Sequence, residues 1–334
     1  MEDAVLYITA QGSRLTRTGE RLLVRGKDGK IASDIPLFRL QEVVCFGCVE
    51  FSCSALTALV RRGIDVVFLT VDGRFKCRLS NLQPKAVNCR LRQYCRAGEP
   101  AFRLRQAQTI VRGKMHNSRV WLLRQNRNRD DAVAAQIMGV KTCIDLVDRA
   151  STINELMGIE GTGARNHFDA LKRLLKQDLG FSGRVRRPPT DPVNAMLSFA
   201  YTLLFNRVLS AVEQGGLDPM LANLHAFEDR RPSLALDLME EFRVPVVDSI
   251  VMAMVNRVEV GPGDFTMLSG KGIRMSEIAI GKLVRAFQAR LSEQLPHPVN
   301  GKSYSFREMI VQQAWQYKSV VLGEADEYRP IAIR

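Results

Sequence analysis

The pattern that decides the fold begins at residues 99–125, which read EPAFRLRQAQTIVRGKMHNSRVWLLRQ. From Glu99 onward apolar residues recur at spacings of three and four, and glycine and proline become sparse, as in amphipathic helices. Asp191 and Pro192 form a helix start, with the aspartate as cap and the proline in the first turn. The pattern predicts helices at about residues 101–127, 130–148, 160–176, 191–213, 233–242, 245–257, 275–294 and 303–319.

Short β-rich runs precede this helical region, separated by turn signals rich in glycine, serine and aspartate. One helix interrupts them, with Ser54 as its cap and Gly63 at its end. The runs are residues 5–9, 21–24, 35–38, 42–46, 65–69 and 75–79. We therefore predict an α+β protein of two domains. A small β-sandwich-like N-terminal domain at residues 1–83 is joined by a linker at 84–98 to a larger all-helical catalytic domain at 99–334.

The charge balance indicates a polyanionic partner. The chain has 48 Lys and Arg against 35 Asp and Glu, a formal charge of +13. This favours nucleic acid first and an anionic membrane second, with a basic enzyme of no special partner as the alternative. Residues 85–129 hold twelve Lys or Arg and one acid, Glu99, and residues 184–187 form a second basic patch. Such surfaces bind backbone phosphates without reading sequence.

Membrane insertion and secretion are not expected. The acidic start at Met1–Ala4 does not resemble a signal peptide, and no apolar run reaches the roughly 18 residues of a membrane span. The seven cysteines are odd in number and lie in the first half, which favours reduced thiols in a cytoplasmic protein. Cys45 and Cys48 form a CxxC in an apolar run without a second pair, so packed thiols are favoured over zinc.

The helix predicted at residues 233–242 carries three carboxylates. Asp237, Glu240 and Glu241 lie at i, i+3 and i+4, which places them on one face. Like charges packed this way repel unless a cation lies among them. His225 precedes the helix across a loop, and one imidazole with carboxylate oxygens suits Mg²⁺ or Mn²⁺ better than zinc. The alternative is an acidic surface helix neutralised by Arg243.

A further acidic ligand is expected from residues 157–165, MGIEGTGAR. Glu160 lies there between glycines, at the start of a predicted helix, and glycines allow a backbone or a phosphate to approach closely. The segment is not a dinucleotide fingerprint, because no strand precedes it and the glycine spacing is wrong. The chain also lacks a GxxxxGK[ST] phosphate loop, so we expect no nucleotide cofactor.

At these segments the sequence resembles the CRISPR-associated adaptation integrase, the first-numbered protein family of that system, over nearly its whole length. The most specific strings are MGIEG at 157–161, RPSLALDLMEEFR at 231–243, DPVNAMLS at 191–198 and YRP at 328–330. The resemblance implies an N-terminal β domain for dimerisation and a C-terminal helical domain that binds DNA. It also implies a homodimer that assembles with a small second CRISPR-associated protein.

The resemblance implies that Glu160, His225 and Glu240 are the catalytic metal ligands, for Mg²⁺ or Mn²⁺. Asp237 and Glu241 are candidates for supporting these ligands. The residues expected to meet DNA are Arg243, Arg165, Lys114, Arg119, Arg186 and Arg187. The sequence departs from the family around His225: Asn223 stands where a glycine is usual, and Glu228 and Asp229 add negative charge after the histidine.

The expected chemistry is metal-assisted phosphoryl transfer. A 3′-hydroxyl of a short DNA duplex attacks a phosphodiester at the boundary of a CRISPR repeat, and the ion stabilises the charge on attacking and leaving oxygens. Water in place of the hydroxyl gives endonuclease activity. Two alternatives remain: a structure-selective nuclease without an integration role, and a non-catalytic DNA-binding scaffold.

Overall fold

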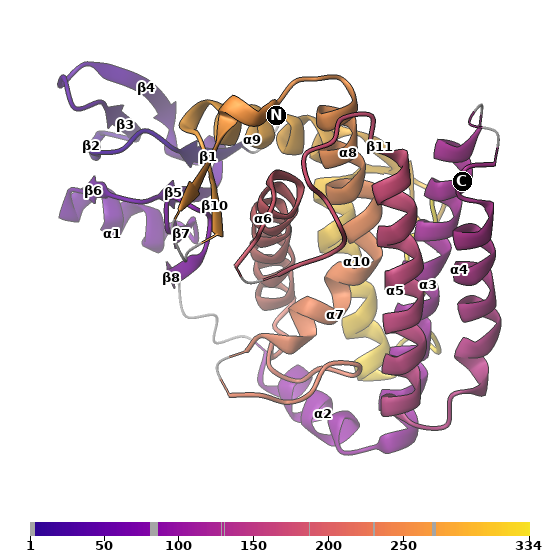
Figure 1. The fold of residues 1–334 in the computed structure, drawn as a ribbon. Helices are drawn as coiled ribbons and strands as arrows, with labels where there is room; N and C mark the ends of the chain where they lie inside the picture. The colour runs from indigo at the N-terminus through magenta and orange to yellow at the C-terminus, as the bar shows by residue number, and fades with distance from the viewer. Residues whose placement is uncertain are drawn as a thin grey trace. The chain divides into compact units, whose positions relative to one another are not determined.

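The computed structural model describes residues 4–80, 86–127, 129, 131–186, 188–229, 231–268 and 272–334. The chain divides into two compact units (Figure 1). The first unit comprises Met1–Leu82 and Arg274–Val284, and the second comprises Gln83–Ile273 and Arg285–Arg334. The first break falls close to the predicted residue 83. The grouping of 274–284 with the first unit departs from the prediction, which placed all of 99–334 in one domain.

Within the described residues, the first unit holds two four-stranded sheets. One has the order β1(Ala4–Ile8), β5(Leu40–Phe46), β7(Asp65–Leu69) and β8(Phe75–Leu79). Its first three strands are parallel, and β8 is antiparallel to β7. The other sheet has the order β4(Ile31–Pro36), β3(Arg21–Arg25), β2(Ser13–Thr18) and β6(Val49–Phe51). Helix α1(Cys53–Arg61) follows β6.

A single apolar core joins both sheets and α1. It includes Leu15 of β2, Leu22 of β3, Val43 of β5 and Leu59 of α1, all fully buried. Strand β5 is an almost continuous apolar run because it lies between two parallel neighbours and is covered on both faces. Five of the predicted strand regions match strands of the structure, whereas the one at 35–38 only overlaps the end of β4, because Leu37–Arg39 is a 3-10 helix. The sequence prediction lacked β2, which is largely polar, and β6, which has only three residues, and it placed the cap of α1 at Ser54 instead of Ser52.

All seven cysteines are free thiols, as expected. Cys45 is buried in β5, and burial raises the pKa of its thiol to about 12. Cys48 is exposed, so the two sulfurs of the CxxC lie in different environments.

The second unit is mainly helical (Figure 1). Its helices are α2(Val87–Ala97), α3(Pro100–Asn126), α4(Ala134–Leu146), α5(Ile153–Leu174), α6(Pro192–Gln214), α7(Ser233–Phe242), α8(Ser249–Asn256) and α10(Phe306–Leu322), and α9(Glu277–Ser292) belongs to both units. The expected linker at 84–98 is therefore mostly the helix α2. The expectation of an all-helical domain is also wrong, because β11(Gln294–Pro296) pairs with β12(Ser303–Ser305) and β9(Phe265–Leu268) pairs with β10(Gly272–Met275).

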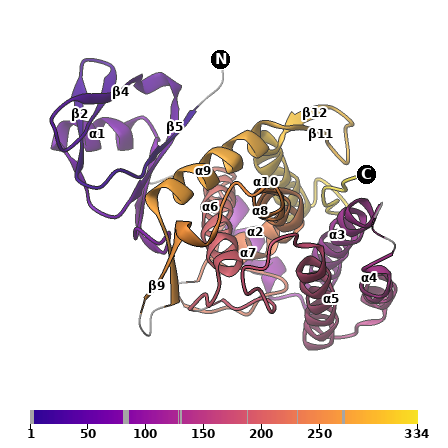
Figure 2. The same ribbon diagram turned by 45° about the horizontal axis from the view of Figure 1, so that its top comes forward.

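Helix α6 is the central helix of this unit, and Figure 2 shows it among α7, α8 and α10. By length and composition α6 resembles a membrane span, although the sequence analysis found no such run. In the structure 78% of its most apolar 18-residue window is buried inside the protein, so α6 is a core helix.

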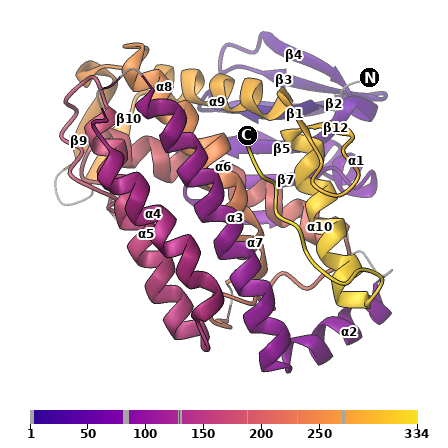
Figure 3. The same ribbon diagram turned by 90° about the vertical axis from the view of Figure 1, so that its right-hand side faces the viewer.

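Helices α3, α4 and α5 pack side by side (Figure 3), and α3 also contacts α7. Helix α5 begins at Ile153, where the Thr152 side chain accepts a hydrogen bond from the Glu155 backbone. Glu160 therefore lies two turns inside a helix, not at its start as predicted.

Helix α7 continues without a break into a π-helical segment, Arg243–Asp248, and then into α8. Such segments are rare and frequent at functional sites.

The predicted helix start at Asp191 is confirmed, and it allows a stability test. The buried Asp191 carboxylate accepts hydrogen bonds from the Asn194 backbone at 2.8 Å and from the Asn194 amide at 2.6 Å. Asp191→Ala is expected to lower the free energy of unfolding by about 1–2 kcal/mol, as for other lost helix caps. Asp145→Ala breaks an exposed i,i+4 pair with Lys141 and should change it by at most about 0.5 kcal/mol. Urea unfolding of both variants measures the difference, and equal losses would contradict the assigned cap.

Candidate metal and DNA site

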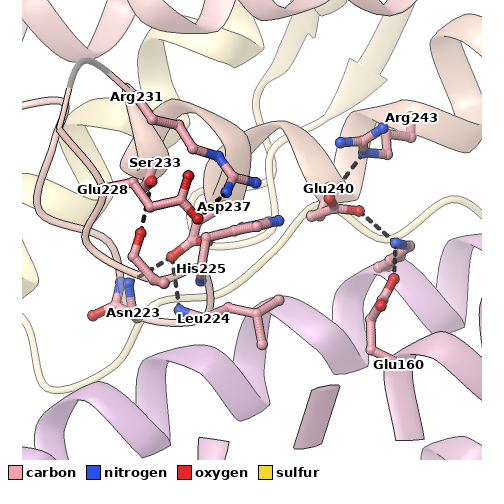
Figure 4. A network of polar contacts seen from close by, with 12 residues as sticks. Glu160, Asn223, Leu224, His225, Glu228, Arg231, Ser233, Asp237, Glu240 and Arg243 are labelled. Atoms are coloured by element: carbon pink, nitrogen blue, oxygen red, sulfur yellow. Dashed lines mark hydrogen bonds and ion pairs between the residues drawn. The ribbon is translucent and has the colours of Figure 1, made fainter. Parts of the chain in front are cut away.

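Two of the predicted ligands converge on one ammonium group. Figure 4 shows Glu160 of α5 and Glu240 of α7 pointing toward the same place. The Lys114 ammonium of α3 donates a hydrogen bond to Glu160 Oε1 and lies 2.6 Å from Glu240 Oε2. Three helices that are far apart in the sequence thus each contribute one charged group.

The ion pairs of Glu240 with Lys114 and Arg243 are deeply buried. The Glu240 side chain is 4% exposed, and Arg243 Nε lies 2.9 Å from Glu240 Oε1. Burial alone would raise the pKa of Glu240, but Arg243 and Lys114 outweigh it and lower that pKa to about 2. Burial opposes the charge of Lys114 in the same way, and Glu240 and Glu160 raise its pKa nevertheless. Both groups are therefore charged at neutral pH.

His225 is held by Asp237. The Asp237 side chain is fully buried and accepts backbone hydrogen bonds from Asn223, Leu224 and His225 at 2.6, 2.9 and 3.2 Å. It also lies 2.6 Å from His225 Nδ1 (Figure 4). A carboxylate at Nδ1 favours the tautomer with its proton there, which leaves the Nε2 lone pair for a metal. Asp237 thus fixes both the loop and the imidazole.

Glu241 faces away from these groups. Its buried carboxylate accepts hydrogen bonds from the Tyr328 hydroxyl, the Ile331 backbone and the Gln313 amide. Burial raises the pKa of Glu241 to about 7, and the hydrogen bonds offset only part of that effect. The prediction that the three carboxylates share one face and one cation is therefore wrong. Asp237, Glu240 and Glu241 have three separate sets of partners.

Glu228 does not join this cluster. It pairs with Arg231 at 2.7 Å, and its side chain is 54% exposed (Figure 4). The extra negative charge after His225 is therefore at least partly neutralised in the loop, away from Glu160 and Glu240.

A pocket of about 440 Å³ opens beside Glu160. Five cationic side chains are among its lining residues: Lys114, Arg165, Arg184, Arg186 and Arg243. Four of the residues expected to meet DNA therefore share one pocket, and Arg184 joins them. Arg119 is not part of the lining, and Arg187 lies outside the described residues.

The wall of the pocket contains a buried polar network that sequence reasoning missed. His167 Nδ1 lies 2.8 Å from Ser118 Oγ, and His167 Nε2 lies 2.9 Å from Asp248 Oδ2. The Tyr201 hydroxyl donates to Asp248, and the Arg243 guanidinium lies 4.7 Å from the centre of the Tyr201 ring. One sequence signal was present, since His167 lies seven residues after Glu160 and so on the same face of α5.

The resemblance implied Glu160, Glu240 and His225 as the metal ligands. Among the described residues no three His, Cys, Asp or Glu side chains lie close enough together to ligate one ion as they stand. The Lys114 ammonium lies where the two carboxylates meet.

Comparison with known proteins agrees with this fold. Residues 6–289 match the family of CRISPR associated protein Cas1. A relative from Thermus thermophilus, named CRISPR-associated endonuclease Cas1 3, is 34% identical over 331 residues, 99% of this chain and 97% of the relative.

Two solved structures have the same fold. One is a casposase bound to an integration product, with a TM-score of 0.88 at 19% identity, covering 98% of this chain and 93% of the other. The second is a Cas6-RT-Cas1–Cas2 complex, with a TM-score of 0.86 at 23% identity. It covers 100% of this chain, which spans only 36% of that longer chain. These likenesses confirm a mixed α and β fold, and the family match and the relative show that the chain belongs to the Cas1 family.

Proposed function

We propose that the chain is a divalent-metal-dependent DNA integrase and endonuclease of CRISPR adaptation, which inserts short DNA fragments into a CRISPR array. One observation carries the proposal. Carboxylates from α5 and α7 converge on a single cation at the edge of a pocket lined by five cationic side chains. Membership of the Cas1 family and a relative named as an endonuclease support it.

The donor chemistry of Glu160, Glu240 and His225 suits a divalent ion. Glu160 and Glu240 come from different helices and meet one positive charge, so the space between them accepts a cation. Two carboxylates with one imidazole, His225, form a donor set suited to Mg²⁺ or Mn²⁺. Bound there, the ion would supply charge stabilisation to a phosphodiester and to the attacking oxygen. Lys114 has to give up its place between the carboxylates for this to happen.

The cationic residues of the pocket bind and orient the DNA backbone. Arg165 and Arg186 are exposed at the pocket and can reach phosphates from solvent. Arg243 is held between Glu240 and the Tyr201 ring, so its guanidinium is fixed before DNA arrives. Fixed donors around a phosphate stabilise transition-state charge without reorganisation.

The proposed reaction is a displacement at phosphorus. The 3′-hydroxyl of the fragment forms a new P–O bond and gives up its proton, while the P–O bond to the 3′-oxygen of the released strand breaks and that oxygen takes up a proton. Water as the attacking group gives hydrolysis, so integrase and endonuclease activities use the same residues.

We also propose the assembly in which this occurs: a cytoplasmic homodimer with a small second CRISPR-associated protein. The likeness to the Cas1 part of a Cas1–Cas2 complex supports that partner. A site in each of two protomers would join the two ends of one fragment. A structure-selective nuclease without integration is the main alternative, and a joining assay separates the two.

Glu160→Gln and Glu240→Gln test the catalytic assignment. Each keeps the size of the side chain but removes a negative ligand, so joining of labelled duplex to a supercoiled plasmid carrying a repeat array should fall at least about 100-fold. The assay contains Mn²⁺ and the partner protein. The matched control is Glu228→Gln, an exposed carboxylate of the His225 loop, which should join like wild type. Wild-type joining by Glu160→Gln would refute the mechanism, and cleavage without joining by the wild type would favour the nuclease alternative.

Lys114→Met tests whether ammonium and metal share one place. Without metal the variant leaves a broken buried ion pair, which costs up to about 3–5 kcal/mol. We therefore expect a lower Tm in EDTA and a larger gain in Tm on adding Mn²⁺ than in wild type. Lys141→Met, which breaks an exposed pair with Asp145, should respond to Mn²⁺ as wild type does. Calorimetric Tm values decide, and an equal Mn²⁺ response in all three proteins would argue against a shared place.

Arg186→Ala tests the phosphate pocket. Removing one phosphate contact should weaken duplex binding and reduce the slope of log K against log salt by about 1. Arg257→Ala serves as control, because that side chain, directly after α8, is 74% exposed and does not line the pocket. Fluorescence anisotropy over a salt series measures both slopes. Equal slopes for Arg186→Ala and wild type would show that Arg186 does not contact phosphate.

A further inference from the structure

The last residues of the chain pack against the catalytic helices. After α10 the backbone reverses at Gly323, which has a φ of +77°, and then runs without regular secondary structure. Figure 3 shows this segment passing from α10 toward α3. We name residues 328–333 the C-terminal strap. Tyr328 and Ile331 are buried at 3% and 0% exposure, so the strap is part of the protein interior.

Glu241 anchors the strap to α7. Its carboxylate accepts hydrogen bonds from the Tyr328 hydroxyl and the Ile331 backbone, at the two ends of the Tyr328–Ile331 stretch. Gln313 of α10 donates to the same carboxylate at 3.1 and 3.2 Å, and to the Arg329 carbonyl at 3.0 Å. A buried carboxylate with several donors fixes its neighbours firmly, because loss of any partner leaves a buried polar group unsatisfied.

Asn117 ties the strap to α3 as well. Its amide donates to the Glu241 carbonyl at 2.8 Å and to the Ile331 carbonyl at 3.0 Å, and it accepts from the Ile333 backbone at 3.0 Å. One fully buried side chain therefore joins α3, α7 and the strap. Asn117 lies three residues after Lys114, and Glu241 directly follows Glu240.

The fit of the strap on α3 leaves no room for a side chain at Gly113. A Cβ there would lie 2.4 Å from Pro330 Cβ and 2.7 Å from Pro330 Cγ. Gly113 is in the interior of α3, where glycine costs helix stability, so the close approach of Pro330 is a physical reason for it. Gly113 directly precedes Lys114.

We infer that the C-terminal strap is a positioning element, in which Glu241, Asn117 and Tyr328 set the alignment of Lys114 on α3 with Glu240 on α7. The inference rests on the proposed function, because that function depends on the carboxylates of Glu160 and Glu240, which Lys114 joins. None of the three residues lines the pocket, so they act through the helices and not on the substrate. A shift of one helix along the other by about 1 Å can cost a reaction about 100-fold.

A matched pair of glycine variants tests the strap in the full chain with its partner protein. Gly113→Ala forces a methyl group into Pro330, whereas Gly158→Ala in α5 meets no atom within 4 Å. Both variants gain the same helix propensity. We expect the turnover of plasmid joining to fall about 10–100-fold in Gly113→Ala, with the Kd for DNA unchanged. Gly158→Ala should have the turnover of wild type.

Tyr328→Phe is the second variant, and it carries the test if Gly113→Ala does not fold. It keeps the ring but removes the donor to Glu241, so turnover should again fall at constant Kd, with faster amide exchange in α7. Wild-type turnover in the folded variants, or a parallel loss of turnover and DNA binding, would overturn the inference. Glu160→Gln, measured alongside, separates the two proposals. If it joins like wild type, the proposed function fails; if it is inactive and the strap variants are not, only the strap inference fails.

Discussion

The structure around the site depends on one constraint: a charge removed from water has to be neutralised by a partner in fixed geometry. Glu240 is almost completely buried, and an isolated carboxylate there would be very unfavourable. Lys114 and Arg243 neutralise it, and Lys114 in turn requires Glu160. Helices α3, α5 and α7 are therefore joined by electrostatics as well as by apolar packing. A pair of this kind is strongly coupled, because removing either partner leaves the other buried and unpaired.

The same constraint explains why Asp237, Glu240 and Glu241 do not share the common environment that their spacing predicted. The i, i+3, i+4 spacing places three carboxylates on adjacent rows of α7 but says nothing of what packs against each row. Because α7 is buried nearly all round, each carboxylate meets a different neighbour: the His225 loop, Lys114 or the C-terminal strap. Lys114 lies 126 residues before Glu240, and Ile331 of the strap lies 90 residues after Glu241, so no local pattern reveals these two neighbours.

The elements of the fold were predictable to the extent that their signals are local. Asp191 with Pro192 gave the start of α6, and continuous apolar runs gave β5 and β7. Thr152 is also a local cap, but the glycines at 158, 161 and 163 obscured the helix that it begins. Those glycines are tolerated inside α5, and at Gly163 a Cβ would lie 2.3 Å from Met115 Sδ, so the methionine side chain would have to move. Strand β2 is too polar and strand β6 too short to stand out without their partner strands.

The π-helical segment after α7 fixes the geometry of the wall that it contributes to the pocket. In an α-helix, residues five apart point about 140° away from each other, given 3.6 residues per turn. Arg243 and Asp248 are five apart, yet both meet Tyr201: the guanidinium lies over its ring and the carboxylate accepts from its hydroxyl. The i→i+5 hydrogen bonding of a π-helix brings such residues onto one side. Pro245 within the segment has no N–H to donate, and its carbonyl accepts from Arg290 Nε at 2.6 Å and from the Ser249 hydroxyl at 2.7 Å. The widened turn therefore allows one tyrosine to hold the arginine that neutralises Glu240 and the aspartate that holds His167.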